Sequence, residues 1–129
     1  MIRYTYTQTG ATHPAPFVHV TLRTPVSNSP LEITDAPGQI DRAADRTVIP
    51  ESLVQQLQLV HLDSMEVAGL GGVVTTLPTY VVVLQVRGAQ ALSIEVLASN
   101  GEPWILLGRD VLNQIRIVLD GPARFVEIG

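Results

Sequence analysis

One stretch of this chain decides its fold: Gln39-Ile40-Asp41-Arg42-Ala43-Ala44-Asp45-Arg46-Thr47-Val48-Ile49-Pro50. It is a loop of small residues with a carboxylate, Asp41, near its start, and β-like segments enter and leave it. A carboxylate at the edge of an apolar core loses hydration, which costs free energy unless hydrogen bonds replace it. Asp41 is therefore a candidate for chemistry. The alternative is that its side chain only closes its own turn, as aspartates in such loops commonly do.

Short extended segments precede the loop, and a helix follows it. Phe17–Arg23 alternates apolar and polar residues with the period of a half-buried strand. Residues 31–33 resume extended structure, and residues 34–38, which combine Asp, Pro and Gly, predict a turn that leads into the loop. After Pro50, Leu and Val positions four and three apart predict a short helix over residues 51–59.

The second half of the chain is also mostly β-like. Residues 67–74 are rich in glycine and predict the tip of a mobile hairpin, since no Lys-Ser or Lys-Thr follows them as a phosphate-binding loop requires. With about eight short strands and two brief helices, the pattern predicts a mainly antiparallel all-β domain of barrel or sandwich type. The other expected elements are an edge strand or arm within residues 1–16, strands at 79–86, 92–96, 104–107, 115–119 and 125–128, and a short helix at 109–114.

Composition limits the size, partners and location of the protein. A chain of 129 residues suits one domain, residues 1–129, and its 46% hydrophobic content with only 16% charged residues leaves room for an apolar interface between subunits. The net charge of −4 and the scattered basic residues argue against nucleic acid as a partner. No apolar run reaches the ~18 residues of a membrane helix. We therefore expect no membrane association and a cytoplasmic protein.

Three separated motifs together resemble the retropepsin-like (clan AA) aspartic protease family. The stretch around Asp41 is similar to the family's catalytic Asp-Thr/Ser-Gly-Ala loop. The segment Gly69-Leu70-Gly71-Gly72, with Val73 after it, is similar to the glycine-rich flap that closes over substrate. The third motif is similar to the family's apolar-apolar-Gly sequence and the helix after it, and here reads Ile105-Leu106-Leu107-Gly108-Arg109-Asp110-Val111-Leu112.

The resemblance implies a closed antiparallel β-barrel with one lobe per chain and an aspartic endopeptidase acting on peptide or protein substrates without a cofactor. Such chemistry needs two carboxylates. This chain has only one suitable loop, so the dyad would be formed by Asp41 from each chain of a homodimer. In the family the termini of both subunits commonly interleave as an interface sheet. The resemblance also implies an ion pair between Asp45 and Arg109, with residues 107–110 as structural support.

The loop departs from the family pattern at two positions. Arg42 stands where the family has Thr or Ser, and a guanidinium cannot accept the hydrogen bond that a hydroxyl accepts. Ala43 stands where the family has Gly, and Ala44 follows it. The alternative function is therefore a catalytically impaired domain that serves as a dimerisation or peptide-binding module.

Other chemistries find little support. The histidines show no metal-ligand spacing with one another or with a carboxylate, so we expect no metal site. The serines lack the context of a nucleophile elbow, and the absence of cysteine excludes a thiol nucleophile. Trp104 is expected to anchor the core or an interface. An unrelated β-sandwich binding domain is the third possibility.

Overall fold

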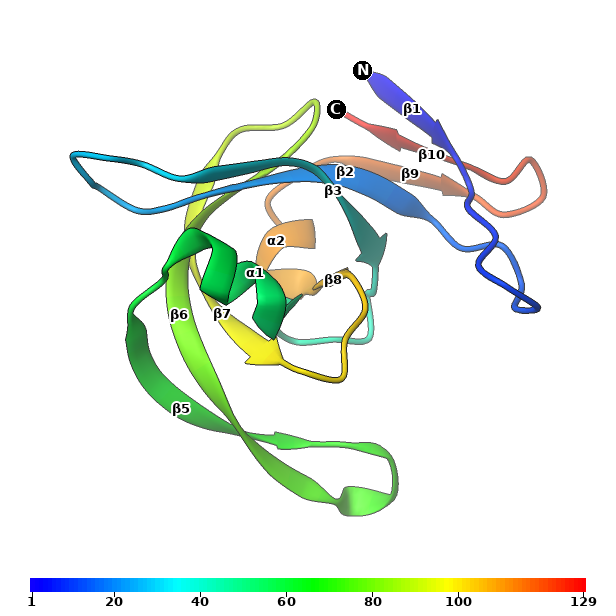
Figure 1. Cartoon of the computed structure of the whole chain (residues 1–129). Coiled ribbons are helices and arrows are strands. Elements are labelled where there is room, and N and C mark those ends of the chain that lie inside the picture. Colours follow the sequence, from blue (N-terminus) through cyan, green and yellow to red (C-terminus); the bar gives the residue numbers. More distant parts are fainter.

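The computed structural model describes all residues, 1–129, and consists of ten strands, two short α-helices and one 3-10 turn (Figure 1). Neither helix has the length and apolar character needed to cross a membrane. In chain order the elements are β1 (Ile2–Thr5), β2 (Phe17–Arg23), β3 (Glu32–Ile40), β4 (Val48–Pro50), α1 (Glu51–Leu57), β5 (His61–Ala68), η1 (Leu70–Gly72), β6 (Val74–Val86), β7 (Leu92–Ser99), β8 (Ile105–Leu107), α2 (Arg109–Leu112), β9 (Ile117–Asp120) and β10 (Phe125–Ile128).

Six strands close into a barrel. The large sheet has the order β2-β3-β8-β4-β7-β6-β5, and an additional β2–β6 pairing joins its two sides. Strand β5 lies outside this ring and pairs only with β6. Most pairings are antiparallel, while β3–β8 and β4–β7 are parallel. The predicted all-β barrel with one lobe per chain is confirmed.

Apolar side chains from every barrel strand fill the interior. The core cluster contains 19 buried residues, and alternate positions of β2 supply Val18, Val20 and Leu22 at 0% exposure. Helix α1 packs Val54 and Leu57 onto this core and ends where Gln58 adopts a left-handed φ of 52°. The alternation in the sequence therefore matches the inner face of the barrel.

The turn predicted at residues 34–38 is wrong, because β3 runs through it. The turn-forming residues instead make a β-bulge against β2, where Asp35 has a φ of 54°. Pro37 is tolerated because its nitrogen faces β8. Ile40 N donates to Pro16 O on the β2 side. The N–H groups of successive residues in a strand point in opposite directions, so the nitrogen of residue 37, an odd-numbered position, faces away from β2. Pairing with β8 begins only at Gly38, so the missing N–H of Pro37 leaves no ladder bond unmade.

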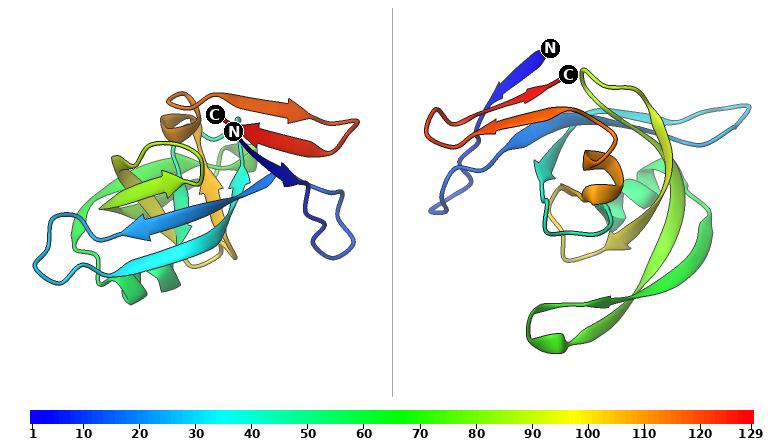
Figure 2. Two further views of the ribbon diagram at one scale, coloured as in Figure 1. Left: turned by 90° about the horizontal axis from the view of Figure 1, so that it is seen from above. Right: turned by 180° about the vertical axis from the view of Figure 1, so that it is seen from behind.

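Both termini belong to a second, three-stranded sheet with the order β1-β10-β9 (Figure 2). Ile2 to Thr5 pair in antiparallel register with Ile128 to Phe125, and β10 pairs with β9 on its other side. The edge strand expected near the N-terminus is confirmed. Because β10 already has a neighbour from its own chain on each side, interleaved termini would require β1 or β9 to leave this sheet.

Candidate functional site

Asp41 lies where two parallel strands end side by side. The register Ile40↔Leu107 aligns the ends of β3 and β8, and Asp41 N continues the ladder by donating to Leu107 O at 3.0 Å. The first and third sequence motifs are thus adjacent in space. The position of Asp41 is fixed by the barrel rather than by the loop alone.

The Asp41 carboxylate is oriented by its own loop. Oδ1 accepts hydrogen bonds from Ala43 N at 3.2 Å and Ala44 N at 3.3 Å, and Ala44 N also donates to Asp41 O. The turn-closing role considered for this aspartate is therefore present. Oδ2 has no hydrogen-bond partner within the chain, so closing the turn leaves one carboxylate oxygen for another group.

The third motif clamps the loop through Arg109. Arg109 N donates to Ala44 O at 2.9 Å, and its Nη1 donates to Arg42 O at 2.9 Å and Ala43 O at 3.1 Å. Its Nη2 lies 3.5 Å from Asp45 Oδ1, which confirms the predicted ion pair. Because the Asp45 side chain is 85% exposed, we expect this pair to add little stability. The bonds to the two carbonyls do more to fix the loop.

Beneath the loop lies a buried contact that the sequence did not reveal. Thr47 is fully buried, its N and Oγ1 donate to Asp110 Oδ2 and Oδ1 at 3.1 and 2.7 Å, and its Oγ1 accepts from Gly108 N at 3.1 Å. Asp110 Oδ1 also accepts from Val111 N at 2.9 Å, at the start of α2. One threonine and one aspartate therefore join the end of the loop to the start of the helix.

Asp110→Ala should lower the free energy of unfolding by about 2–3 kcal/mol, because it leaves the N–H and hydroxyl of buried Thr47 without an acceptor. Denaturant titration followed by circular dichroism measures this loss. Asp110→Asn keeps one acceptor oxygen and should lose less. Asp63→Ala, on exposed β5, is the matched control and should change stability by less than about 0.5 kcal/mol. Equal losses for Asp110→Ala and Asp63→Ala would contradict the role assigned to Asp110.

The two residues that depart from the family pattern are both exposed. The Arg42 side chain makes no hydrogen bond or ion pair within the chain. Ala43 does not have a positive φ, so a methyl group is accommodated here without backbone strain. The loop therefore keeps its shape with Ala at this position, and Arg42 places a free cation one residue from Asp41.

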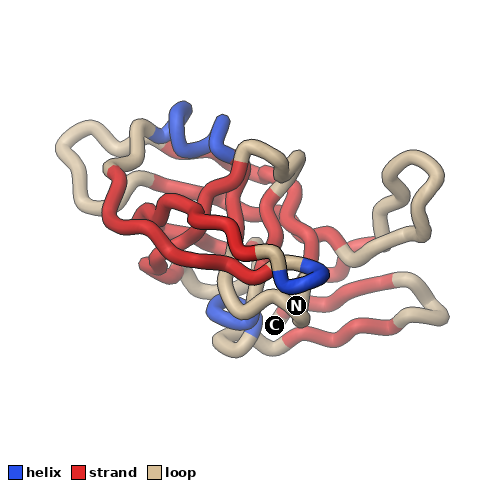
Figure 3. Tube along the Cα trace, turned by 90° about the horizontal axis from the view of Figure 1, so that it is seen from below, coloured by secondary structure: helices blue, strands red, loops and turns tan.

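The glycine-rich segment forms the tip of a long hairpin made by β5 and β6. It is part of the chain nearest the viewer in Figure 3. Gly69 N donates to Val73 O at 2.8 Å, and Gly71 and Gly72 have φ values of 79° and 76°, which favour glycine. Leu70 is fully exposed at the tip. The hairpin predicted here is present, but β5 itself was not predicted as a strand.

A cleft of about 430 Å³ lies between the Asp41 loop and this hairpin. One wall comes from the loop and from β4 and β7, and the other from β5. Its lining is mostly apolar, with charged groups of Asp45, Arg46 and Glu66 among it. The apolar part includes Ala43, Ala44, Val48, Met65, Val67 and Leu97.

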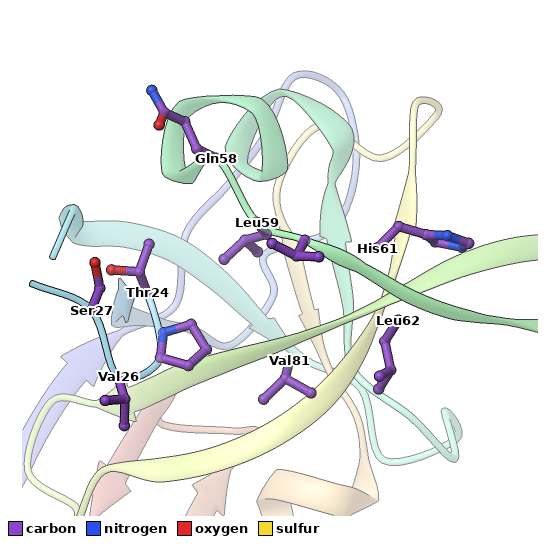
Figure 4. Close-up of a pocket in the computed structure, with 10 residues that line it drawn as sticks. Thr24, Val26, Ser27, Gln58, Leu59, His61, Leu62 and Val81 are labelled. Carbon is purple, nitrogen blue, oxygen red and sulfur yellow. The ribbon is translucent and has the colours of Figure 1, made fainter. Parts of the chain in front are cut away.

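A second cavity of about 430 Å³ lies at the other end of the hairpin, between α1, the β2–β3 loop and the start of β5 (Figure 4). It contains none of the predicted site residues.

Trp104 lies outside both cavities and is half-buried. Its ring packs edge-to-face on Phe17, with ring centroids 5.0 Å apart, and its Nε1 donates to Gln39 Oε1 at 2.9 Å. Trp104 is therefore a packing anchor for the start of β8 and the end of β3.

A closed barrel with an aspartate loop and a glycine-tipped hairpin defines the single-lobed class of aspartic proteases. A sequence model described as retroviral aspartyl protease matches residues 12–120, and the chain belongs to this family. Members of the family work as dimers on peptide substrates. None of the curated proteins compared with the chain matches it.

Two solved structures share the fold. The solution structure of simian foamy virus (mac) protease has 18% sequence identity and a TM-score of 0.52, and the match covers 75% of this chain and 91% of that one. EIAV protease, solved in complex with the inhibitor HBY-793, has 20% identity and a TM-score of 0.53, with 83% of this chain and 92% of that chain covered. At these identities the likeness establishes the fold.

Proposed function

We propose that the chain, as a single domain over residues 1–129, is an aspartic endopeptidase whose dyad is formed by Asp41 from each subunit of a homodimer. The observation that carries this proposal is the hydrogen bonding of the Asp41 carboxylate, which leaves one of its two oxygens without a partner. Its Oδ1 is held by the N–H groups of Ala43 and Ala44, which line a cleft, and its Oδ2 has no partner within the chain. A carboxylate fixed in this way is ready to meet a second one.

The dyad would work through one shared proton. Two carboxyls about 3 Å apart cannot both be ionised, so one is protonated. The ionised Asp41 takes a proton from water, whose oxygen bonds to the peptide carbonyl carbon, while the protonated Asp41 gives its proton to the carbonyl oxygen. The C–N bond then breaks as the nitrogen takes the proton that the first Asp41 gained from water, and a hydroxyl of the tetrahedral intermediate returns its proton to the other Asp41, which restores the starting state.

The homodimer follows from the number of suitable aspartates. Asp35 lies at the bulge of β3, Asp63 is exposed on β5, and Asp120 accepts from Ala123 N in a turn. None of the three joins the site of Asp41, Asp45 is paired with Arg109, and Asp110 is bound by Thr47, which supports a second carboxyl from another copy. The peptide would lie between the loops and the hairpins, with an apolar side chain in the cleft beside Ala44 and Met65.

A second function, a catalytically silent module that binds peptides or dimerises, is supported by Arg42. Its free guanidinium is one residue from Asp41. If it turned toward the dyad it would favour two ionised carboxylates, and the shared proton would be lost. Such a domain could still bind an extended peptide in the same cleft.

Cleavage of a mixed peptide library between about pH 4 and 7 tests the proposal, since a shared-proton dyad works on the acid side of neutrality. Wild type should cleave, and Asp41→Asn should lose at least about 10³-fold in kcat/KM, because an amide cannot act as the base. Asp63→Asn, on exposed β5, is the matched control and should cleave as wild type does. Equal, inactive profiles for wild type and Asp41→Asn would reject the peptidase and favour the silent module.

A further inference from the structure

The terminal sheet leaves two strand edges without partners, β1 and β9. Unpaired edges offer rows of N–H and C=O groups that readily pair with another strand. In the left panel of Figure 2, β9 forms the outer margin of the terminal sheet. The β9 edge is therefore open to a strand from a second copy.

The backbone groups on the free edge of β9 can be identified from its bonds to β10. Gly129 N donates to Arg116 O at 3.0 Å, so the backbone N–H and C=O groups of the even-numbered residues Arg116, Val118 and Asp120 face β10. The N–H and C=O groups of Ile117 and Leu119 alternate with them and point away from the chain. Both residues can thus make ladder bonds to a partner strand without losing a bond to β10.

The sequence of this edge is complementary to itself. A two-fold axis at Val118 pairs Ile117 with the partner's Leu119 and places Arg116 opposite the partner's Asp120. Neither Arg116 nor Asp120 has an ion-pair partner within its own chain. Opposite charges directly across an antiparallel pair are favourable, and the symmetry makes this contact twice.

The other free edge lacks this property. A two-fold axis at Arg3 of β1 would place it against the partner's Arg3, which is unfavourable, and an axis at Tyr4 would place Arg3 against the partner's Thr5, which offers no opposite charge. Within the chain Arg3 is already paired with Glu127 and lies over the Phe125 ring, 4.1 Å from its centroid. The β1 edge is therefore the poorer surface for a second copy.

We propose that the dimer forms by antiparallel pairing of β9 with the partner's β9 about a two-fold axis at Val118, giving one continuous sheet of six strands without exchange of termini. This inference rests on the homodimer of the proposed function and specifies its interface. It differs from interleaved termini, because β1 and β10 stay with their own chain.

A single cysteine at the axis tests this register, since the protein has none of its own. Val118 and the partner's Val118 would be a non-hydrogen-bonded pair with Cα atoms about 4.5 Å apart, within disulfide range. Val118→Cys should therefore convert almost fully to a covalent dimer on mild oxidation, seen on a non-reducing gel. Thr5→Cys on exposed β1 is the matched control and should stay monomeric on that gel.

Charge exchange gives an independent readout in sedimentation experiments. Arg116→Glu should raise the dimer dissociation constant about tenfold, and adding Asp120→Lys should restore most of it, whereas Arg87→Glu should leave it unchanged. A wild-type dimer in which Val118→Cys does not cross-link, or in which Thr5→Cys does, would overturn this interface while leaving the peptidase proposal standing. Equal, inactive cleavage profiles for wild type and Asp41→Asn, with Val118→Cys still cross-linking, would reject the peptidase and leave this interface standing. A monomeric wild type would overturn both.

Discussion

Replacing Arg42 by Thr together with Ala43 by Gly is expected to raise kcat/KM for peptide cleavage by about 100-fold. The reason is electrostatic: whenever the Arg42 guanidinium turned toward the dyad it would favour two ionised carboxylates, and the acid–base step needs one of them protonated. The Arg42 side chain is exposed and makes no bond within the chain, so its removal should not disturb the loop.

Kinetics with a peptide cleaved by the wild type, measured across pH 4 to 7, provide the comparison. Arg87→Thr removes the same charge from the exposed β6–β7 turn and should leave kcat/KM unchanged. If the double variant were no faster than wild type, Arg42 would not be what limits the dyad. Activity in the double variant alone would show that the barrel and the dimer are competent and that the loop is the defect.

Gly108→Ala is expected to destabilise the protein by about 3 kcal/mol or more. A Cβ at this position would lie 2.5 Å from Arg46 C, 2.7 Å from Arg46 O and 2.9 Å from Thr47 N. These are backbone atoms of the Asp41 loop, so they can move only if the loop separates from β8. The same movement would break the Gly108 N bond to Thr47 Oγ1.

Denaturant unfolding of both variants measures this effect against Gly121→Ala. Gly121 lies in the turn after β9, and a Cβ there would meet no atom within 4 Å. The control should therefore stay within about 0.5 kcal/mol of wild type. Similar unfolding curves for Gly108→Ala and wild type would mean that the loop and β8 are not in the contact described.

The parts of the fold that the sequence predicted are those in which local pattern and burial agree. Phe17–Arg23 alternates in the sequence and on the inner face of the barrel, and the helix at Glu51 begins at the expected residue. The pairing of Asp45 with Arg109 followed from the family resemblance, because both residues lie within its motifs. The structure also brings the first and third motifs together, because the end of β8 pairs with the end of β3 and Arg109 binds the Asp41 loop.

The missed features depend on contacts that no local pattern encodes. Strand β5 is largely exposed and its sequence has no regular alternation, so only its pairing with β6 makes it a strand. Residues 34–38 have turn composition, but pairing with β2 turns them into a bulge. Thr47 looked like any β-branched residue in a strand, and its contact with Asp110 spans 63 positions. Long-range pairing decided each case.

The most direct test of the Asp41 dyad is the separation of the two Asp41 carboxylates in a crystal structure of the protein from a solution shown to contain dimers. The proposal predicts closest oxygens about 3 Å apart, with both Arg42 guanidinium groups turned away from them. Loops separated by more than a water-bridged distance, or Arg42 inserted between the two carboxylates, would contradict it.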